Sequence, residues 1–118
     1  MYTISKQFHF SASHCLYGLR DDHPCSRLHG HNYIIEVVLQ CEELRTTGFV
    51  LDYNDLQPLK TYIDETLDHR HLNEVFAPMQ TSAENIARRL YEWCRARWPQ
   101  TVAVRVSETP KTWAEYRP

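Results

Sequence analysis

The sequence lacks the features that mark membrane, secreted or nucleic-acid-binding proteins. No apolar run is long enough to cross a bilayer, and residues 1–7 do not resemble a signal peptide. The net charge of −2 gives no general basic field that would recruit nucleic acid. Four cysteines form no C-x-x-C pair, so we expect free thiols in a reducing, cytoplasmic setting. There is also no internal repeat, linker or low-complexity tract.

The composition is that of an ordinary globular domain. The chain has 118 residues, of which 42% are hydrophobic and 24% charged. A chain of this length buries about two-thirds of its unfolded surface. We therefore expect one domain covering residues 1–118.

Two histidines that lie two positions apart are the first chemical signal. His29 and His31 flank Gly30, and on a β-strand both side chains would point to the same face. A third histidine, His14, ends an alternating row that starts with Phe8-x-Phe10. If the two strands are adjacent and antiparallel, the three imidazoles meet. Three neutral imidazoles with an open fourth position are typical of a catalytic zinc site.

Two other interpretations of these histidines are open. A single histidine on an apolar strand is usually a hydrogen-bonded core residue, and H-G-H alone can be a turn. Three histidines in register, with Cys25 four residues before the pair, favour the metal site.

The cysteines differ in their surroundings. Cys41 shares the parity of an apolar strand row and Cys94 lies on a predicted helix, so both are expected to pack in the core. Cys25 instead lies near Arg27 and the histidine pair. A cation and a metal would lower the pKa of its thiol, which makes Cys25 a candidate base or nucleophile. The alternative is an unused loop thiol.

The order of elements predicts the fold class. Strands are expected at 2–14 and 29–42, a helix after Asp52 or Asn54, a second helix opened by the capping box Thr81–Glu84, and two final strands after Pro99. This order is ββααββ. It predicts an α+β fold, with two helices on one face of a four-stranded antiparallel sheet. The open edges of that sheet favour oligomerisation.

The arrangement of these motifs resembles the 6-pyruvoyltetrahydropterin synthase family, which has the tunnelling fold. The resemblance covers nearly the whole chain. It is carried by six motifs in order: F-x-F-x-A-x-H at 8–14, C-x3-H-G-H at 25–31, T-G-F-V-L-D-Y at 47–53, L-D-H-R-H-L-N at 67–73, T-S-A-E-N at 81–85, and S-E-T at 107–109. Animal pyruvoyl synthases place five residues between the cysteine and H-G-H. The three found here resemble the bacterial branch, 6-carboxy-5,6,7,8-tetrahydropterin synthase of queuosine (7-deazaguanine) biosynthesis.

The resemblance implies a reaction and roles for particular residues. The reaction converts 7,8-dihydroneopterin triphosphate to 6-carboxytetrahydropterin, acetaldehyde and triphosphate. In this family the sites lie between subunits of a homohexamer whose sheets form a barrel. The implied residues are His14, His29 and His31 for Zn²⁺, Cys25, Asp68 and His69 for catalysis, and Glu108 and Glu84 for the pterin.

Three charged residues, Glu108, Glu84 and Arg27, are candidates for binding the substrate. Glu108 ends an apolar strand row, where a carboxylate is costly unless it is paired, and a pterin edge offers two donors. A strand end that reaches water is the alternative. Glu84 is already explained by the capping box. Arg27 is a candidate triphosphate contact, although isolated basic residues are usually only solvated.

Three other functions compete with this prediction. A pyruvoyl-type synthase would share every ligand and stop after triphosphate elimination. A non-catalytic zinc-binding assembly module would leave Cys25, Asp68 and His69 without a role. A zinc hydratase with three histidines would not explain Glu108.

Overall fold

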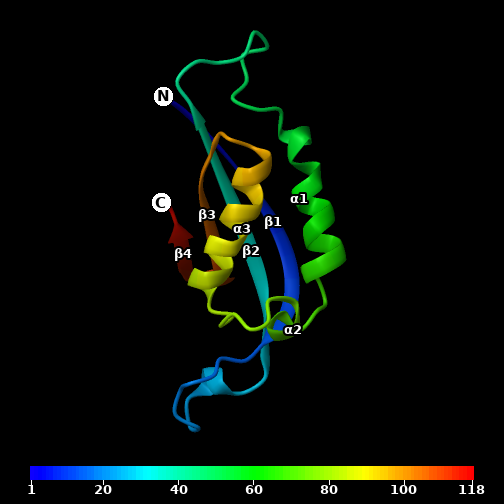
Figure 1. Cartoon of the computed structure of the whole chain (residues 1–118), viewed down its shortest axis with the longest axis vertical. Helices are drawn as coiled ribbons and strands as arrows, with labels where there is room; N and C mark the ends of the chain where they lie inside the picture. The colour runs from blue at the N-terminus through cyan, green and yellow to red at the C-terminus, as the bar shows by residue number, and fades with distance from the viewer.

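The centre of the molecule is a long β-hairpin (Figure 1). The computed structural model describes residues 1–118 as a body of 55 × 25 × 25 Å. Strands β1 (Tyr2–His14) and β2 (His29–Cys41) pair antiparallel along their whole length, from Tyr2 opposite Cys41 to His14 opposite His29. Both strands begin and end within a residue or so of the prediction. The register follows from the alternation of apolar residues, because a slip of one position would expose the buried row.

The sheet is completed by the C-terminal hairpin. Strands β3 (Thr101–Thr109) and β4 (Thr112–Tyr116) add to β2 in the order β1-β2-β3-β4, and all neighbours are antiparallel. The predicted four-stranded antiparallel α+β fold is therefore confirmed.

Helices cover one face of this sheet (Figure 1). A continuous helical segment runs through a 3₁₀ turn η2 (Tyr53–Leu56), α1 (Gln57–Tyr62) and a π-helical turn η3 (Ile63–Leu67). Asp52 caps its start by accepting from the N–H of Asn54. Its inner stripe is fully buried, as the spacing predicts: Leu56, Leu59, Ile63 and Leu67. The longest helix is α3 (Ala83–Arg97).

The core lies between the helices and the inner face of the sheet. It is one cluster of 23 buried residues. Phe10 stacks on Tyr33 across the β1–β2 pair, with ring centroids 4.9 Å apart. Fully burying a side chain of this kind contributes about 1.5–3 kcal/mol. The core thus fixes which face of the hairpin carries the histidines.

Two details of the helices differ from the prediction. A further single turn, α2 (Leu72–Val75), follows the histidine-rich segment. The cap of α3 is Ser82, whose hydroxyl accepts from the N–H of Asn85, and not Thr81. The predicted capping box of Thr81 and Glu84 is therefore wrong, because two adjacent hydroxyl residues compete for the cap and Thr81 is fully buried. Glu84 takes no part in the cap.

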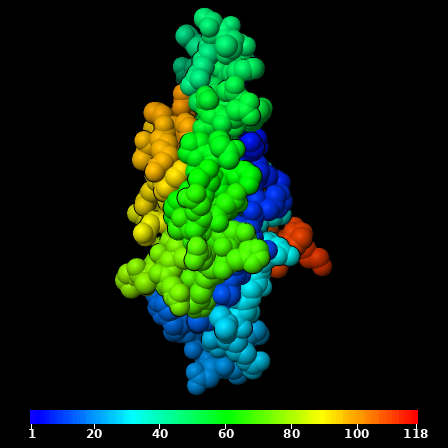
Figure 2. Space-filling view, turned by 90° about the vertical axis from the view of Figure 1, so that its right-hand side faces the viewer, coloured from blue at the N-terminus to red at the C-terminus, as the bar shows by residue number.

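The loops extend the molecule at both ends of the hairpin. The space-filling view shows the 15–28 loop as a projecting tip at the end of the sheet where β1 ends and β2 begins (Figure 2). This loop contains one 3₁₀ turn, η1 (Pro24–Ser26). None of the helices combines the length and apolar character required for crossing a membrane.

Candidate active site

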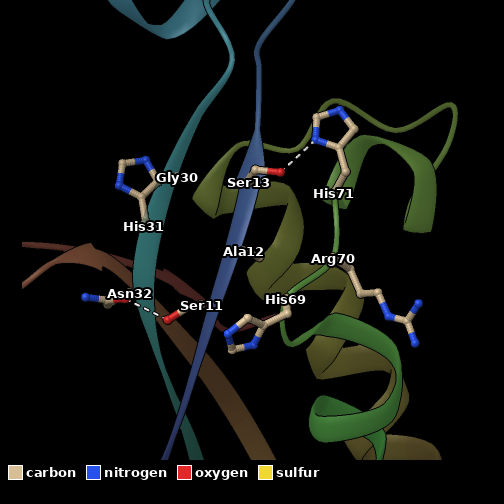
Figure 3. Close-up of a pocket in the computed structure, with 9 residues that line it drawn as sticks. All are labelled: Ser11, Ala12, Ser13, Gly30, His31, Asn32, His69, Arg70 and His71. Atoms are coloured by element: carbon tan, nitrogen blue, oxygen red, sulfur yellow. Dashed lines mark hydrogen bonds between the residues drawn. The ribbon is translucent and has the colours of Figure 1, made fainter.

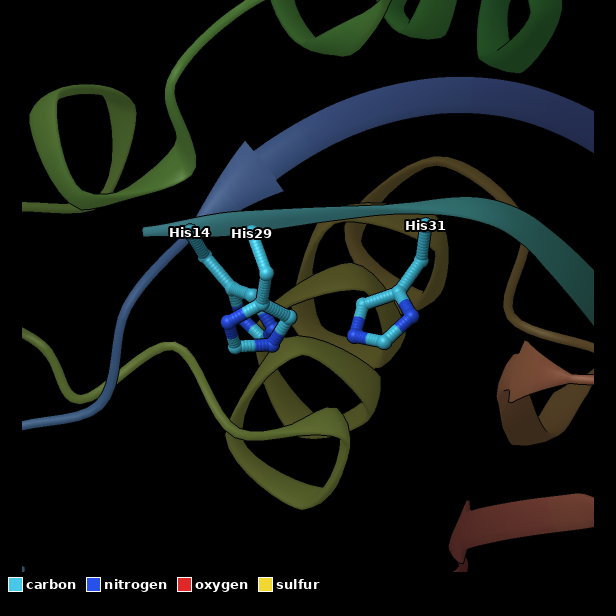
Figure 4. A group of neighbouring side chains, drawn as sticks. All are labelled: His14, His29 and His31. Carbon is cyan, nitrogen blue, oxygen red and sulfur yellow. The ribbon is translucent and has the colours of Figure 1, made fainter. Parts of the chain in front are cut away.

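Three histidines meet where β1 ends and β2 begins. His14 is paired with His29, and His31 lies opposite Ala12, so all three belong to the face that continues into the core. Their ring centroids lie 4.5–5.1 Å apart, and one ring nitrogen of each falls within 4.8 Å of the other two. Figure 4 shows the three rings projecting from the same side of the hairpin. They are close enough to hold a metal ion.

Backbone carbonyls set the tautomer of two of these rings. Nδ1 of His14 lies 2.8 Å from the carbonyl oxygen of Thr81, and Nδ1 of His29 lies 2.7 Å from that of Arg27. A carbonyl oxygen only accepts, so each Nδ1 carries the proton and each Nε2 presents a lone pair. Nε2 of His14 is buried and has no partner. A buried acceptor without a partner is costly, and a cation at the centre of the cluster would satisfy it.

Burial also favours the neutral form of the rings. It is the main cause that lowers the pKa of His14, whose side chain is fully buried. Burial likewise lowers the pKa of His31, and nearby Glu108 only partly opposes this effect. Neutral imidazole is the form that binds metals.

Glu108 approaches the cluster from β3. Its Oε2 lies 3.0 Å from Nε2 of His31. That nitrogen makes no hydrogen bond, so the carboxylate lies beside the ring without a directed bond to it. Glu108 and Glu84 both line a cavity of about 320 Å³ beside the β3–β4 hairpin. The structure thus brings both predicted pterin contacts to one cavity, next to the histidines.

Cys25 lies on η1, in the projecting loop, and is partly exposed. Its carbonyl oxygen accepts from the N–H of Leu16, which ties the loop to the segment just after His14. Its own N–H donates to Nδ1 of His23. The side chain of Arg27 is exposed, and this residue enters the site through its carbonyl oxygen on His29.

Asp68 and His69 form a hydrogen-bonded pair at the end of η3. Nδ1 of His69 lies 2.8 Å from Oδ2 of Asp68, and the other carboxylate oxygen accepts from the N–H of Ser11 on β1. These hydrogen bonds, that from Ser11 first, lower the pKa of Asp68. His69 has a φ of 58°, in the left-handed region that is unusual for a residue other than glycine. Its ring is 82% exposed, so its Nε2 is accessible to another group.

The segment that carries this pair follows the outer edge of β1. The N–H of His69 donates to the carbonyl of Ser11, and the N–H of Ser13 donates to that of Arg70. Here a cavity of about 640 Å³ opens, lined by Ser11, Ser13, Asn32, His69, Arg70 and His71 among others (Figure 3). Of the three clustered histidines only His31 borders it. The Asp68–His69 pair and the Glu84–Glu108 cavity are therefore separate within one chain.

Three site residues were missed by the sequence prediction. Thr81 is fully buried, and its carbonyl orients His14. The Asn73 side chain bonds to the backbone of Cys15. Tyr33 places a buried hydroxyl without a partner beneath His14 and His31, and burial raises its pKa. The only sequence signal for any of them is the adjacent pair Thr81-Ser82, because a single helix start uses one hydroxyl as its cap and leaves the other free.

Comparison with known proteins identifies the family. The sequence model of the family described as 6-pyruvoyl tetrahydropterin synthase matches residues 3–118. The chain belongs to this family. Among solved structures, the Caenorhabditis elegans 6-pyruvoyl tetrahydropterin synthase superposes with a TM-score of 0.86 at 28% identity, covering 99% of this chain and 95% of that one.

Relatives within the family carry two different names. A Synechocystis protein named 6-carboxy-5,6,7,8-tetrahydropterin synthase is 32% identical over 122 residues, covering 98% of this chain and 93% of its own. A Pongo abelii protein named 6-pyruvoyl tetrahydrobiopterin synthase is 36% identical over 107 residues, covering 76% and 70%. The carboxy-type relative aligns over more of both chains.

Proposed function

We propose that this chain is a zinc-dependent 6-carboxy-5,6,7,8-tetrahydropterin synthase. It would convert 7,8-dihydroneopterin triphosphate to 6-carboxytetrahydropterin, acetaldehyde and triphosphate, a lyase step in queuosine biosynthesis. The observation that carries the proposal is the set of three converging histidine rings, two with tautomers fixed by backbone carbonyls, beside a cavity lined by three glutamates that include Glu84 and Glu108.

The donor set fits zinc. Imidazole nitrogen suits Zn²⁺, and three histidines leave a position for substrate. The buried Nε2 of His14, which has no hydrogen-bond partner, supports this assignment. Zinc, when bound, supplies Lewis acidity toward the vicinal hydroxyl groups of the substrate side chain. His14, His29 and His31 hold it.

The proton transfers of the reaction are assigned to Cys25, Asp68 and His69. Asp68 fixes the orientation of His69 by accepting from its Nδ1, which leaves Nε2 as the exchanging nitrogen. His69 sets the protonation of the Cys25 thiol, and the thiolate removes a carbon-bound proton from the substrate side chain. Triphosphate leaves after this proton transfer. One water molecule is then consumed as the bond between C1′ and C2′ breaks, which leaves the carboxyl carbon on the pterin and releases the other two carbons as acetaldehyde.

The cavity between α3 and the β3–β4 hairpin orients the pterin. The carboxylate of Glu108 accepts from the pterin N3–H and 2-amino group, and Glu84 provides a second acceptor in the same cavity. Arg27 is exposed at the loop and contacts the triphosphate.

The separation of the Asp68–His69 pair from the Glu84–Glu108 cavity supports assembly. If one chain supplies the histidines and Cys25 and a neighbour supplies Asp68 and His69, a complete site forms between subunits. We therefore include a homo-oligomer, a hexamer by family likeness, in the proposal.

Product analysis tests the proposal. Purified protein is incubated with 7,8-dihydroneopterin triphosphate, the pterins are separated by mass spectrometry, and aldehydes are trapped. We expect equal amounts of 6-carboxytetrahydropterin and acetaldehyde. A pyruvoyl product without acetaldehyde would assign the alternative, 6-pyruvoyltetrahydropterin synthase, which the pyruvoyl-named relatives favour. No turnover by zinc-loaded protein would indicate a non-catalytic zinc-binding module.

A matched variant tests the pterin contact separately. Glu108→Gln keeps the shape of the side chain and replaces one acceptor oxygen by a donor, so KM should rise while zinc content stays unchanged. An unaltered KM would remove Glu108 from the substrate site.

A further inference from the structure

Two amide side chains form hydrogen bonds to the backbone of the segment that follows β1. The Asn73 Nδ2 donates to the carbonyl of Cys15 at 2.8 Å, and the N–H of Cys15 donates to the Asn73 Oδ1 at 3.0 Å. Gln80 repeats this pattern two residues later. Its Nε2 donates to the carbonyl of Tyr17 at 2.7 Å, and the N–H of Tyr17 donates to its Oε1 at 3.1 Å. Each amide therefore replaces a partner strand on this edge.

The opposite edge of the same segment is hydrogen-bonded to Cys25. Backbone groups alternate in direction along extended chain, so the N–H of Leu16 points away from the two amides. It donates to the carbonyl of Cys25 at 2.8 Å. A segment fixed at residues 15 and 17 thus presents residue 16 as a rigid attachment point.

This attachment is the main restraint on the loop that carries Cys25. Residues 20–26 otherwise bond among themselves, as between Cys25 and His23 or between Ser26 and Asp21, or to the adjacent residue Arg27. Most of these residues are exposed. Two hydrogen bonds join residues 20–26 to the rest of the chain, and only the one from Leu16 comes from beyond the adjacent residue Arg27, whose N–H donates to the carbonyl of Pro24.

We propose that Gln80 and Asn73 are positioning residues that hold the thiol of Cys25 in place through the segment 15–17. The expected effect on catalysis rests on the proposed function of Cys25, whereas the positioning of the loop rests on these hydrogen bonds alone. Both amides lie in the connection between η3 and α3, on α2 or just before the α3 cap, so helix packing locates the thiol loop.

Gln80 offers the cleaner test of the two. Asn73 also accepts from the hydroxyl of Thr81, whose carbonyl orients His14, so its removal would disturb the histidine cluster as well. The side chain of Gln80 bonds only to Tyr17. Changes at Gln80 should therefore reach Cys25 without reaching the metal ligands.

The experiment compares Gln80→Met with Gln57→Met in the full chain. Gln57 is exposed at the start of α1, remote from the loop. Hydrogen exchange of the Leu16 and Tyr17 amides, zinc content, kcat and KM are measured for both. For Gln80→Met we expect both amides to exchange about tenfold faster, because the Tyr17 N–H loses its acceptor and the bond from Leu16 to Cys25 loses the restraint on the residue beside it. We expect kcat to fall about tenfold, with KM and zinc content unchanged. Gln57→Met should match the parent protein.

Two results would overturn the proposal. Unchanged exchange at Leu16 and Tyr17 would show that the amide does not hold the segment. Zinc loss in parallel with kcat would show that it acts on the metal site. Should Gln80→Met not fold, Gln80→Glu is measured in its place. It keeps an acceptor for the Tyr17 N–H and loses the donor to the Tyr17 carbonyl, so we expect a smaller rise in exchange and a smaller fall in kcat, and no change in either would overturn the proposal. Inactive parent protein, or an active Cys25→Ala, would contradict the proposed function and leave the exchange result standing.

Discussion

Backbone carbonyl oxygens orient two of the three imidazole rings in the histidine cluster. The Nδ1 atoms of His14 and His29 both donate to backbone, one to a distant residue and one to a residue two positions away. Such second-layer bonds fix ring orientation and strengthen the nitrogen that faces the metal. Because the fold supplies them, the site is organised before any ion arrives.

Removal of one imidazole should release the metal. We predict that His29→Ala binds less than a tenth of the zinc held by the parent, because two neutral nitrogens no longer enclose the ion. His29 is partly exposed, so its loss should spare the fold. Metal content after dialysis against a chelator, measured by mass spectrometry, checks this. The control is His9→Ala, an exposed histidine on β1, and full occupancy in His29→Ala would refute the ligand assignment.

Removal of the loop thiol should spare the metal and stop the chemistry. We predict that Cys25→Ala retains zinc and fold but loses about 10²–10⁴-fold in kcat, the usual contribution of a general base. Steady-state kinetics with the pterin triphosphate measure it. Cys41→Ala, at a partly exposed position on β2, is the matched control and should keep its activity. Near-normal turnover in Cys25→Ala would mean that this thiol is not the base.

Among the connecting segments, 68–71 stands out because it behaves as a short extra strand. It bonds to Ser11 and Ser13 on the otherwise open edge of β1. The left-handed backbone at His69 costs of order 1 kcal/mol or more. The paired carboxylate and the edge bonds offset this cost, and together they present the ring to solvent.

Acid should weaken this segment through Asp68. Its pKa is lowered in the folded protein from an ordinary value of 3.8. The stabilisation is therefore complete above about pH 4 and is lost as the pH falls through the folded-state pKa. We predict that Asp68→Asn lowers the free energy of unfolding at neutral pH. The difference from the parent should shrink as the pH falls below 4.

Urea unfolding between pH 2.5 and 7 measures this linkage. Asp21→Asn, an exposed substitution in the projecting loop, serves as the control. A parallel decline of parent and Asp68→Asn across the whole range would contradict the linkage.

Seen as a whole, the molecule has edges and faces that suit assembly. β1 is a terminal strand, and from Tyr2 to Phe10 no segment pairs with its outer edge, while β4 leaves the other edge open. Long open edges are a liability unless a partner covers them. On the outer face Ile34 stays partly exposed, although Val38 is already buried within the chain.

Subunit mixing tests whether sites are shared. We predict that inactive Cys25→Ala and His69→Ala proteins, mixed after reversible dissociation, regain part of the parent activity. Composite sites with both intact residues would then form between unlike chains. Each variant mixed with itself is the control. No recovery despite demonstrated subunit exchange would mean that each chain builds its own site.

The sequence by itself determined the sheet, the main helices and the histidine cluster. Periods of two and of 3.6 residues are written directly in the apolar pattern, and they fixed the register that brings His14, His29 and His31 together. Short-range rules also set the cap at Asp52 and the buried stripe from Leu56 to Leu67. These features depend on neighbours along the chain or directly across a strand pair.

Only the tertiary structure decided how the remaining parts meet. The bonds from Thr81 to His14, from Asn73 to Cys15 and from Gln80 to Tyr17 join residues more than fifty positions apart. The cap at Ser82 depends on which of two adjacent hydroxyl residues is buried. Single hydrogen bonds between distant loops leave no periodic trace in the sequence. The outer position of the Asp68–His69 pair arose in the same way, because edge pairing with β1 placed it there.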